Sequence, residues 1–131
     1  MNANANAGGL IRRFYAARRS GDLAAVAEML ARDVVWREPS VENYMGELIG
    51  ADAVIDMMQR ALATTGGTFR LEVAELIEVA GHCAAVIAWS ADKGDTRIEG
   101  RELATFSVRD GRITFAQFLP ENISDDRLFW S

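Results

Sequence analysis

The first half of the chain carries apolar residues at helical spacing. This pattern predicts three helices, at residues 9–19, 23–30 and 51–63. Gly21 suits the left-handed position that ends the first helix, and Asp22 can cap the second through its carboxylate. Asn and Ala alternate before the first helix without an apolar pattern, so we expect residues 1–8 to form a flexible leader.

The second half changes to the apolar and polar alternation that is typical of half-buried strands. Four strands are predicted, at residues 69–79, 83–90, 98–108 and 112–119. Short turns that contain Gly81, Gly94 and Gly111 separate them, which indicates an antiparallel meander. A shorter strand at 34–38 ends before Pro39, and the region 39–50 lacks periodicity, so we expect a loop there at the rim of a pocket.

Helices first and long strands afterwards predict an α+β fold. Strands of this length twist and curl, so we expect a cone-shaped curved antiparallel sheet with the helices packed on its concave face. A mainly apolar pocket for a small organic molecule would lie between the two layers. We expect residues 9–131 to form a single domain, because 131 residues suit one core.

Charge and composition narrow the classes of partner. The chain has 14 basic and 19 acidic residues and a net charge of -5, so we expect no nucleic-acid partner. We interpret the Arg12-Arg13 and Arg18-Arg19 pairs as a solvated helix face, and a local anion contact is the alternative. One cysteine, Cys83, allows no internal disulfide, and neither a signal peptide nor a membrane-length apolar run is present, so we expect a cytoplasmic protein away from membranes. A phosphate loop, a metal cluster and a dinucleotide fingerprint are all missing, so we expect neither a cofactor nor a metal.

Three stretches and the chain end, in this order, carry a family resemblance: SGDLAAVAEMLARDVVWREP, MGELIGADAVIDMM, ELATFSVRDGRITFAQFLP and LFW. Over about residues 9–130 the chain resembles the nuclear transport factor 2-like superfamily, especially its polyketide-cyclase (SnoaL-like) and ketosteroid-isomerase-like branch. The resemblance implies a cystatin-like α+β barrel, a deep pocket and a homodimer through the outer face of the sheet. Members of the superfamily include isomerases, cyclases, epoxide hydrolases, dehydratases and proteins without catalysis, so the fold alone does not give the activity.

Two glutamates are the first candidates for acid and base catalysis. Glu38 ends the 34–38 strand, where the resemblance places a carboxylate that shuttles a proton, and an apolar cavity would raise its pKa. Glu102 alternates in step with Ala104 and Phe106, which places it on the concave face, where it could share the pocket with Glu38. The alternatives are a rim Glu38 paired with an arginine, and a Glu102 near the open end of its strand paired with an arginine.

Other family positions fit less well. The resemblance aligns Glu121 with an aspartate of the epoxide hydrolases, but the Arg-x-Asp partner is missing from the 83–90 strand, and a surface turn is the alternative. The positions of the isomerase oxyanion donors correspond to Phe14 and Ala104, with Tyr15 one residue away. We interpret His82 as an exposed turn residue and Cys83 as part of the core.

The remaining candidates are pocket-lining residues. We predict that the substrate contacts apolar and aromatic side chains drawn from all parts of the chain: Phe14, Tyr15, Trp36, Tyr44, Met57, Met58, Trp89, Ala104, Phe106, Phe118 and Trp130. A short C-terminal helix capped by Ser124 would bring the aromatic end of the chain back over the cavity or into a dimer contact.

These observations predict a cofactor-free acid/base enzyme of the isomerase, cyclase or epoxide-hydrolase type. Its partner would be a small hydrophobic molecule, polyketide-, terpenoid- or steroid-like, and it would form a homodimer. The alternative is a non-catalytic small-molecule-binding or dimerisation module of the same fold.

Overall fold

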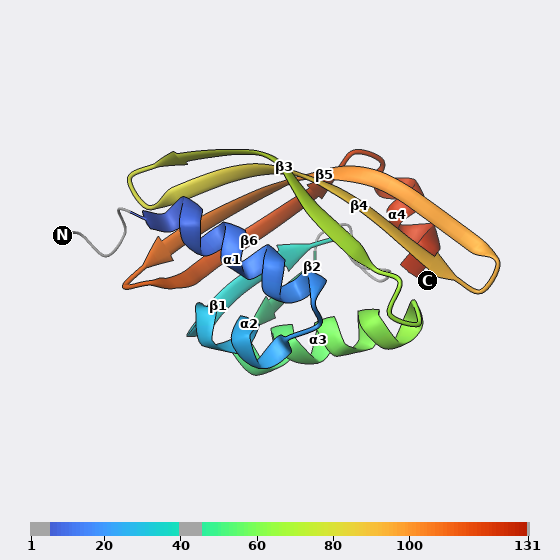
Figure 1. Ribbon diagram of the computed structural model, residues 1–131, viewed down its shortest axis with the longest axis horizontal. Helices are drawn as coiled ribbons and strands as arrows, with labels where there is room; N and C mark the ends of the chain where they lie inside the picture. The colour runs from blue at the N-terminus through green and yellow to red at the C-terminus, as the bar shows by residue number, and fades with distance from the viewer. Residues whose placement is uncertain (1–5, 40–45, 131) are drawn as a thin grey trace.

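The computed structural model describes residues 6–39 and 46–130 and contains four helices and six strands (Figure 1). In chain order these elements are α1 (Ala7–Arg19), α2 (Leu23–Met29), β1 (Leu30–Glu38), β2 (Gly46–Ile49), α3 (Ala51–Thr64), β3 (Arg70–Val79), β4 (His82–Lys93), β5 (Thr96–Arg109), β6 (Arg112–Pro120) and α4 (Ile123–Trp130). None of the helices in the described ranges is long and apolar enough to cross a membrane.

The strands form one curved sheet in the order β2-β1-β6-β5-β4-β3. The meander from β3 to β6 is antiparallel, as predicted, and its tight turns at Ala80-Gly81 and Asp110-Gly111 have positive φ at both residues. One pair of strands departs from the expected antiparallel pattern: β1 pairs with β6 in parallel. The sheet is not closed into a barrel either: β2 and β3 are its two edges. Pairing between distant segments leaves no local pattern, so the sequence did not reveal it.

The predicted loop at 39–50 contains a strand. Gly46–Ile49 pairs with β1, with Val35 opposite Ile49 and Glu38 opposite Gly46. Four residues are too few to show a clear period, and the partner strand determines their conformation. Pairing with β6 on the other side, where Leu30 lies opposite Ile113, explains why β1 begins at Leu30, four residues before the predicted Val34.

Helix α1 begins at Ala7, two residues before the predicted start, so Ala7 and Gly8 of the expected leader belong to the helix and are buried. The N-terminus of α1 has no side-chain cap of its own. Instead, the Gly8 N–H donates to the Glu78 carboxylate at 2.6 Å, from the far end of β3. A negative charge at a helix N-terminus is favourable, so a residue 70 positions away completes this helix.

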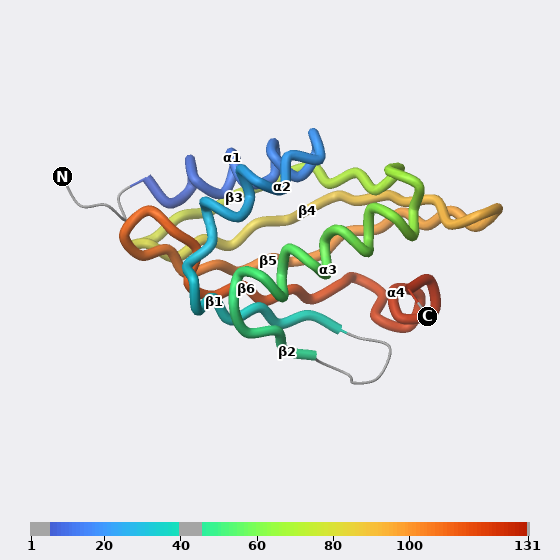
Figure 2. The backbone as a smooth tube through the Cα atoms, turned by 90° about the horizontal axis from the view of Figure 1, so that it is seen from below, coloured from blue at the N-terminus to red at the C-terminus, as the bar shows by residue number. Residues whose placement is uncertain are grey.

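The core lies between the concave face of the sheet and the helices. Helix α1 lies along β3, and α3 packs against α2 and β1 (Figure 2). Aromatic rings fill the centre, with ring centroids 4.6 Å apart for Trp36 and Phe118 and 6.0 Å apart for Phe14 and Phe106. Burial of each such side chain contributes roughly 2–3 kcal/mol, so these rings anchor the helix layer to the sheet.

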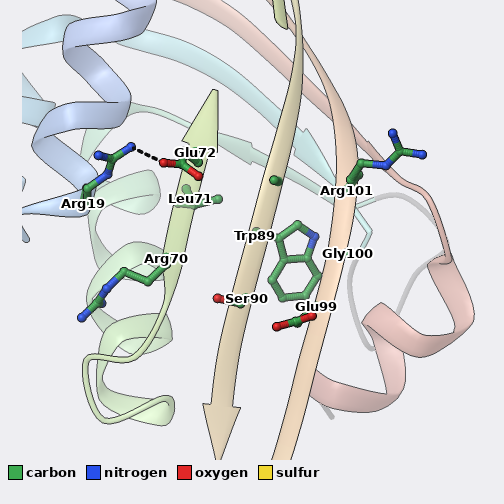
Figure 3. A pocket seen from close by; sticks show the side chains of 10 residues that line it. Arg19, Arg70, Leu71, Glu72, Trp89, Ser90, Glu99, Gly100 and Arg101 are labelled. Carbon is green, nitrogen blue, oxygen red and sulfur yellow. Dashed lines mark ion pairs between the residues drawn. The ribbon is translucent and has the colours of Figure 1, made fainter. Parts of the chain in front are cut away.

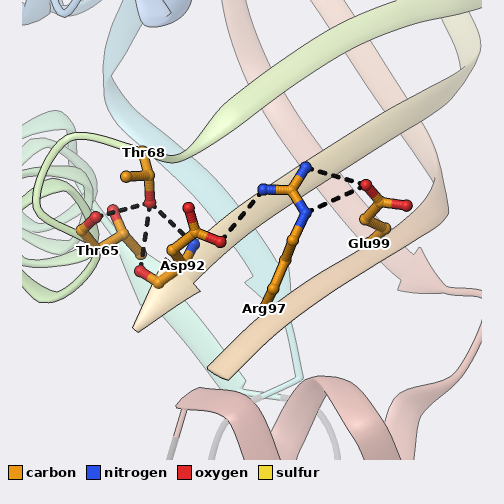
Figure 4. A network of polar contacts seen from close by, with 5 residues as sticks. All are labelled: Thr65, Thr68, Asp92, Arg97 and Glu99. Carbon is orange, nitrogen blue, oxygen red and sulfur yellow. Dashed lines mark hydrogen bonds and ion pairs between the residues drawn. The ribbon is translucent and has the colours of Figure 1, made fainter. Parts of the chain in front are cut away.

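A polar network fastens the end of α3 to β4 (Figure 4). The Thr68 hydroxyl donates to the carbonyl oxygen of Thr65 at 2.6 Å and accepts from the backbone N–H of Asp92 at 2.8 Å. The Asp92 carboxylate in turn accepts from Arg97, which also pairs with Glu99. This network fixes the end of α3, which forms part of the cavity wall described below.

Candidate functional site

A cavity of about 370 Å³ lies at the end of the fold where α1, α3 and α4 meet the concave face of the sheet. Its walls combine aromatic, aliphatic and charged side chains from all layers: Arg18, Glu38, Pro39, Met57, Arg60, Ala61, Thr64, Phe69, Leu71, Trp89, Glu102, Phe118, Pro120, Asp126 and Trp130. The volume suits a small organic molecule. Three carboxyl groups in one partly apolar cavity are unusual, and they make this the candidate functional site.

Strand alternation points Glu38 and Glu102 into this cavity. Glu38 follows the buried Trp36 by two residues on β1, and Glu102 precedes the buried Ala104 by two residues on β5. Both strands flank β6, so the two carboxyl groups reach the same concave surface from either side of it.

The surroundings of the two carboxyl groups differ. Burial raises the pKa of Glu38, but a hydrogen bond from the Trp36 indole, 3.2 Å from Nε1 to Oε2, and the charge of Arg18 oppose this rise. Burial also raises the pKa of Glu102, and with the added charge of Glu38 it reaches about 8. At neutral pH, therefore, Glu102 holds a proton. The pKa of Glu38 is also raised overall, and Arg18 acts against the rise at both groups, but only Glu38 receives the Trp36 hydrogen bond, which favours its carboxylate form.

Sequence reasoning missed three charged residues of the cavity: Arg18, Arg60 and Asp126. Arg18 is half-buried rather than solvent-facing; it lies one helical turn after the buried Phe14, and this i, i+4 relation was the available signal. Asp126, one helical turn before Trp130, lines the same cavity from α4. Burial raises the pKa of Asp126 to about 6, against a hydrogen bond with the Trp130 side chain.

The predicted site residues other than Glu121 fall into three groups. Six of them line the cavity: Glu38, Met57, Trp89, Glu102, Phe118 and Trp130. Six more belong to the buried core: Phe14, Tyr15, Trp36, Met58, Ala104 and Phe106. Tyr44 lies outside the described residues.

Glu121 lies outside the cavity. Its exposed carboxylate pairs with Arg101 at 2.6 Å, so it is not part of the candidate site. The alternative interpretation, a surface residue after the last strand, describes its position. Helix α4 is capped by Asn122, whose side chain accepts from the Asp125 N–H, and not by Ser124.

Tyr15 has an unusual environment. Its side chain is buried, its hydroxyl has no hydrogen-bond partner within the described part of the chain, and burial together with the charge of Glu102 raises its pKa. The indole N–H of Trp89 is likewise buried and has no hydrogen-bond partner among the described residues.

His82 and Cys83 do not contribute to the cavity. His82 is exposed at the start of β4, where its Nδ1 lies 3.2 Å from the Ser107 hydroxyl, and Cys83 is buried. Across residues 6–39 and 46–130, no group of three or more His, Cys, Asp or Glu side chains is arranged to hold a metal ion.

A second hollow, of about 630 Å³, is wider but open (Figure 3). It lies where Arg70 and Glu72 of β3 face Ser90 of β4 and Glu99 of β5, and Arg19 pairs with Glu72 there at 3.7 Å. These charged side chains are exposed, so solvent screens them and the hollow lacks the desolvation that perturbs the carboxyl groups of the inner cavity.

The fold and the acid-lined cavity define a class: α+β domains in which helices cover the concave face of a curved sheet and leave a cavity between the two layers. Residues 11–116 match the SnoaL-like domain family, and the chain belongs to this family. An uncharacterized protein of Mycobacterium tuberculosis is 27% identical over 124 residues, which cover 93% of this chain and 94% of that protein.

Solved structures share the fold at low sequence identity. Bal32a, from a soil-derived mobile gene cassette, is 22% identical, with 99% of this chain and 100% of that chain covered and a TM-score of 0.91. A protein of unknown function with a cystatin-like fold from Xanthomonas campestris is 18% identical, with 100% and 99% covered and a TM-score of 0.86. An LEH-like epoxide hydrolase of M. tuberculosis is 17% identical, with 95% and 89% covered and a TM-score of 0.77. These likenesses show the fold and leave the reaction to be argued from the site.

Proposed function

We propose that this protein is a cofactor-free acid/base enzyme that moves a proton on a small hydrophobic carbonyl compound. The observation that carries the proposal is the asymmetry of the two cavity carboxyls: Trp36 donates a hydrogen bond to Glu38, whereas the pKa of Glu102 is about 8. One cavity then holds a base and an acid at the same pH.

The two groups have complementary roles in this proposal. The Glu38 carboxylate removes a proton from the carbon next to the substrate carbonyl, so the C–H electron pair forms the C=C bond of an enol. The protonated Glu102 donates its hydrogen bond, or its proton, to the carbonyl oxygen as charge develops there. Return of the proton from Glu38 to another carbon of a conjugated system completes an isomerisation and restores both groups.

The cavity walls support a flat or polycyclic substrate. Phe69 lies with its ring centroid 5.7 Å from that of Trp89 and 5.3 Å from that of Trp130, so three aromatic side chains line one region of the cavity. With a volume of about 370 Å³, this suits a polyketide-, terpenoid- or steroid-like skeleton of modest size. Cyclisation or epoxide opening would use the same acid and base, and we place isomerisation first because a matched acid and base suffice for it.

The test is proton exchange on a model ketone. 2-Tetralone has acidic C–H bonds beside its carbonyl, and NMR in D₂O follows their exchange for deuterium. We expect the wild type to exceed the buffer rate by about 100-fold or more, and Glu38→Gln to return it to background. Glu102→Gln, which keeps a donor but cannot transfer a proton, should lose about tenfold or more.

Glu99→Gln is the matched control, because Glu99 lies on the same strand as Glu102 but faces outward and pairs with Arg97 at 2.9 Å. The Glu99→Gln variant should catalyse deuterium exchange on 2-tetralone at the wild-type rate. Exchange that is equal in the wild type and in Glu38→Gln would reject the enzymatic proposal and favour the alternative, a non-catalytic binding or dimerisation module.

We also propose that the outer face of the sheet forms a homodimer. Ile77 and Val79 of β3 are each 67% exposed there, and an apolar groove beside them is lined by Ala84, Thr105 and Phe115. An exposed apolar surface of this kind is typical of an interface. Light scattering after gel filtration should give twice the monomer mass for the wild type and the monomer mass for Val79→Asp; a monomeric wild type would contradict the proposal.

A further inference from the structure

Arg18 is a cation in the cavity that makes no hydrogen bond or ion pair with residues 6–39 and 46–130. Within the described part of the chain, its guanidinium donates no hydrogen bond and has no carboxylate within 4 Å, although it lines the cavity together with Glu38, Glu102 and Asp126. Arg60, the other arginine of the cavity wall, is held by Asp56 at 3.4 Å in the same helix. Within the described chain, therefore, Arg60 has an ion-pair partner, whereas the N–H donors of Arg18 are available to a ligand.

Two aromatic rings hold Arg18 in place. Its Cζ atom lies 5.8 Å from the ring centre of Phe14 and 5.7 Å from that of Phe69. A guanidinium stacks on such rings while its N–H groups stay available at its edge, in a fork that matches two oxygens. A half-buried charge without a counter-ion loses part of its hydration, so an anion that restores this interaction binds favourably.

The nearby carboxyl groups do not supply this counter-ion. Glu102 is protonated at neutral pH and presents a donor rather than a negative charge. Glu38 and Asp126 line the same cavity from β1 and α4, but neither forms an ion pair with Arg18 among the described residues, and Glu38 already accepts from the Trp36 indole. An oxyanion that enters the cavity thus finds a free guanidinium and a neutral donor.

We propose that Arg18 binds an oxyanion of the substrate, either a carboxylate or an acidic enol, carried on a flat conjugated skeleton that lies against Phe69, Trp89 and Trp130. The inference names the substrate class of the site and rests on the proposed function for the choice of cavity. It makes Arg18 a specificity-determining residue: the charge selects acidic members of the hydrophobic compounds that fit.

Matched pairs of probes test the charge. 2-Naphthoate and 2-naphthamide share a ring system and differ in charge, as do 2-hydroxy- and 2-methoxy-1,4-naphthoquinone, and the two pairs separate a carboxylate from an acidic enol. Calorimetry at pH 7 should show at least one anion binding about 10- to 100-fold more tightly than its neutral partner, the range expected for a charge-assisted forked contact.

Arg18→Met should abolish this preference while the neutral probe keeps its affinity within about threefold. Arg18→Lys keeps the charge but loses the fork, so the preference should fall and not vanish. Arg101→Gln, which alters an exposed arginine that pairs with Glu121 outside the cavity, is the control and should leave the preference unchanged. Neutral-probe binding also reports that each variant is folded.

Equal affinity of the wild type for both members of each pair would overturn the inference, and so would a preference that survives Arg18→Met. This failure is distinct from failure of the acid/base proposal. Normal ketone exchange without an anion preference rejects only the role of Arg18, whereas an anion preference without exchange rejects only the catalytic roles of Glu38 and Glu102.

Discussion

Glu102→Gln should remove a pH dependence from the stability of the protein. The pKa of Glu102 rises from 4.5 to about 8, first through burial and then through the charge of Glu38. Between these two values the folded state binds a proton that the unfolded chain has released. Stability from this group is therefore fully present below pH 4.5 and is lost as the pH rises to about 8.

The magnitude follows from the size of the shift. At ~1.4 kcal/mol per pKa unit, a rise from 4.5 to about 8 sets an upper limit of about 5 kcal/mol. The carboxyl lines an open cavity, so solvent screening reduces this, and we expect about 2–3 kcal/mol. Gln has a similar shape and never ionises, so the variant should match the wild type at pH 5 and exceed it by this amount at pH 9.

Urea unfolding at pH 5 and pH 9 measures the difference, with Glu99→Gln as the control on the outer face of the same strand. The control should shift by less than about 0.5 kcal/mol between the two pH values, because its ion pair is exposed. The reasoning is refuted if Glu102→Gln keeps the wild-type pH dependence, or if it is equally destabilised at both pH values.

Three further predictions concern stability alone, and each is read from urea unfolding. Tyr15→Phe should be as stable as the wild type or more stable by about 1 kcal/mol, because it removes a buried hydroxyl without a partner in the described chain; a loss above 1 kcal/mol would show that the hydroxyl is satisfied. Gly8→Ala should cost about 1 kcal/mol of stability despite the higher helix propensity of Ala, because the new Cβ would lie 2.8 Å from the Glu78 carboxylate. In the control Gly100→Ala the nearest neighbour lies 3.5 Å away, so its stability should stay within about 0.5 kcal/mol of the wild type. Equal effects of the two substitutions would contradict the Gly8 contact. Thr68→Val should cost about 1–2 kcal/mol, since the Asp92 N–H loses its acceptor, and an unchanged midpoint would show that this network does not hold α3 to β4.

Local pattern predicted most of the elements. Alternation along residues 69–119 gave the meander and its turns, and it also placed Glu102 on the concave face with Ala104 and Phe106. The pattern is reliable there because each strand has one buried and one exposed face. It failed at Gly46–Ile49, where a short segment is a strand only because β1 lies beside it.

What the sequence by itself determined is the α+β class, the order of most elements and the position of Glu102 on the concave face, because hydrophobic burial imposes a period on the chain. The position of Glu38 at the cavity was expected from the family resemblance. Only the tertiary structure decided the parallel pairing of β1 with β6, the meeting of Arg18 and Asp126 in one cavity and the exclusion of Glu121 from it. The physical reason is that the protonation state of a carboxyl group depends on desolvation and on charges from distant segments, such as the effect of Glu38 on Glu102. Those quantities exist only once the chain has folded.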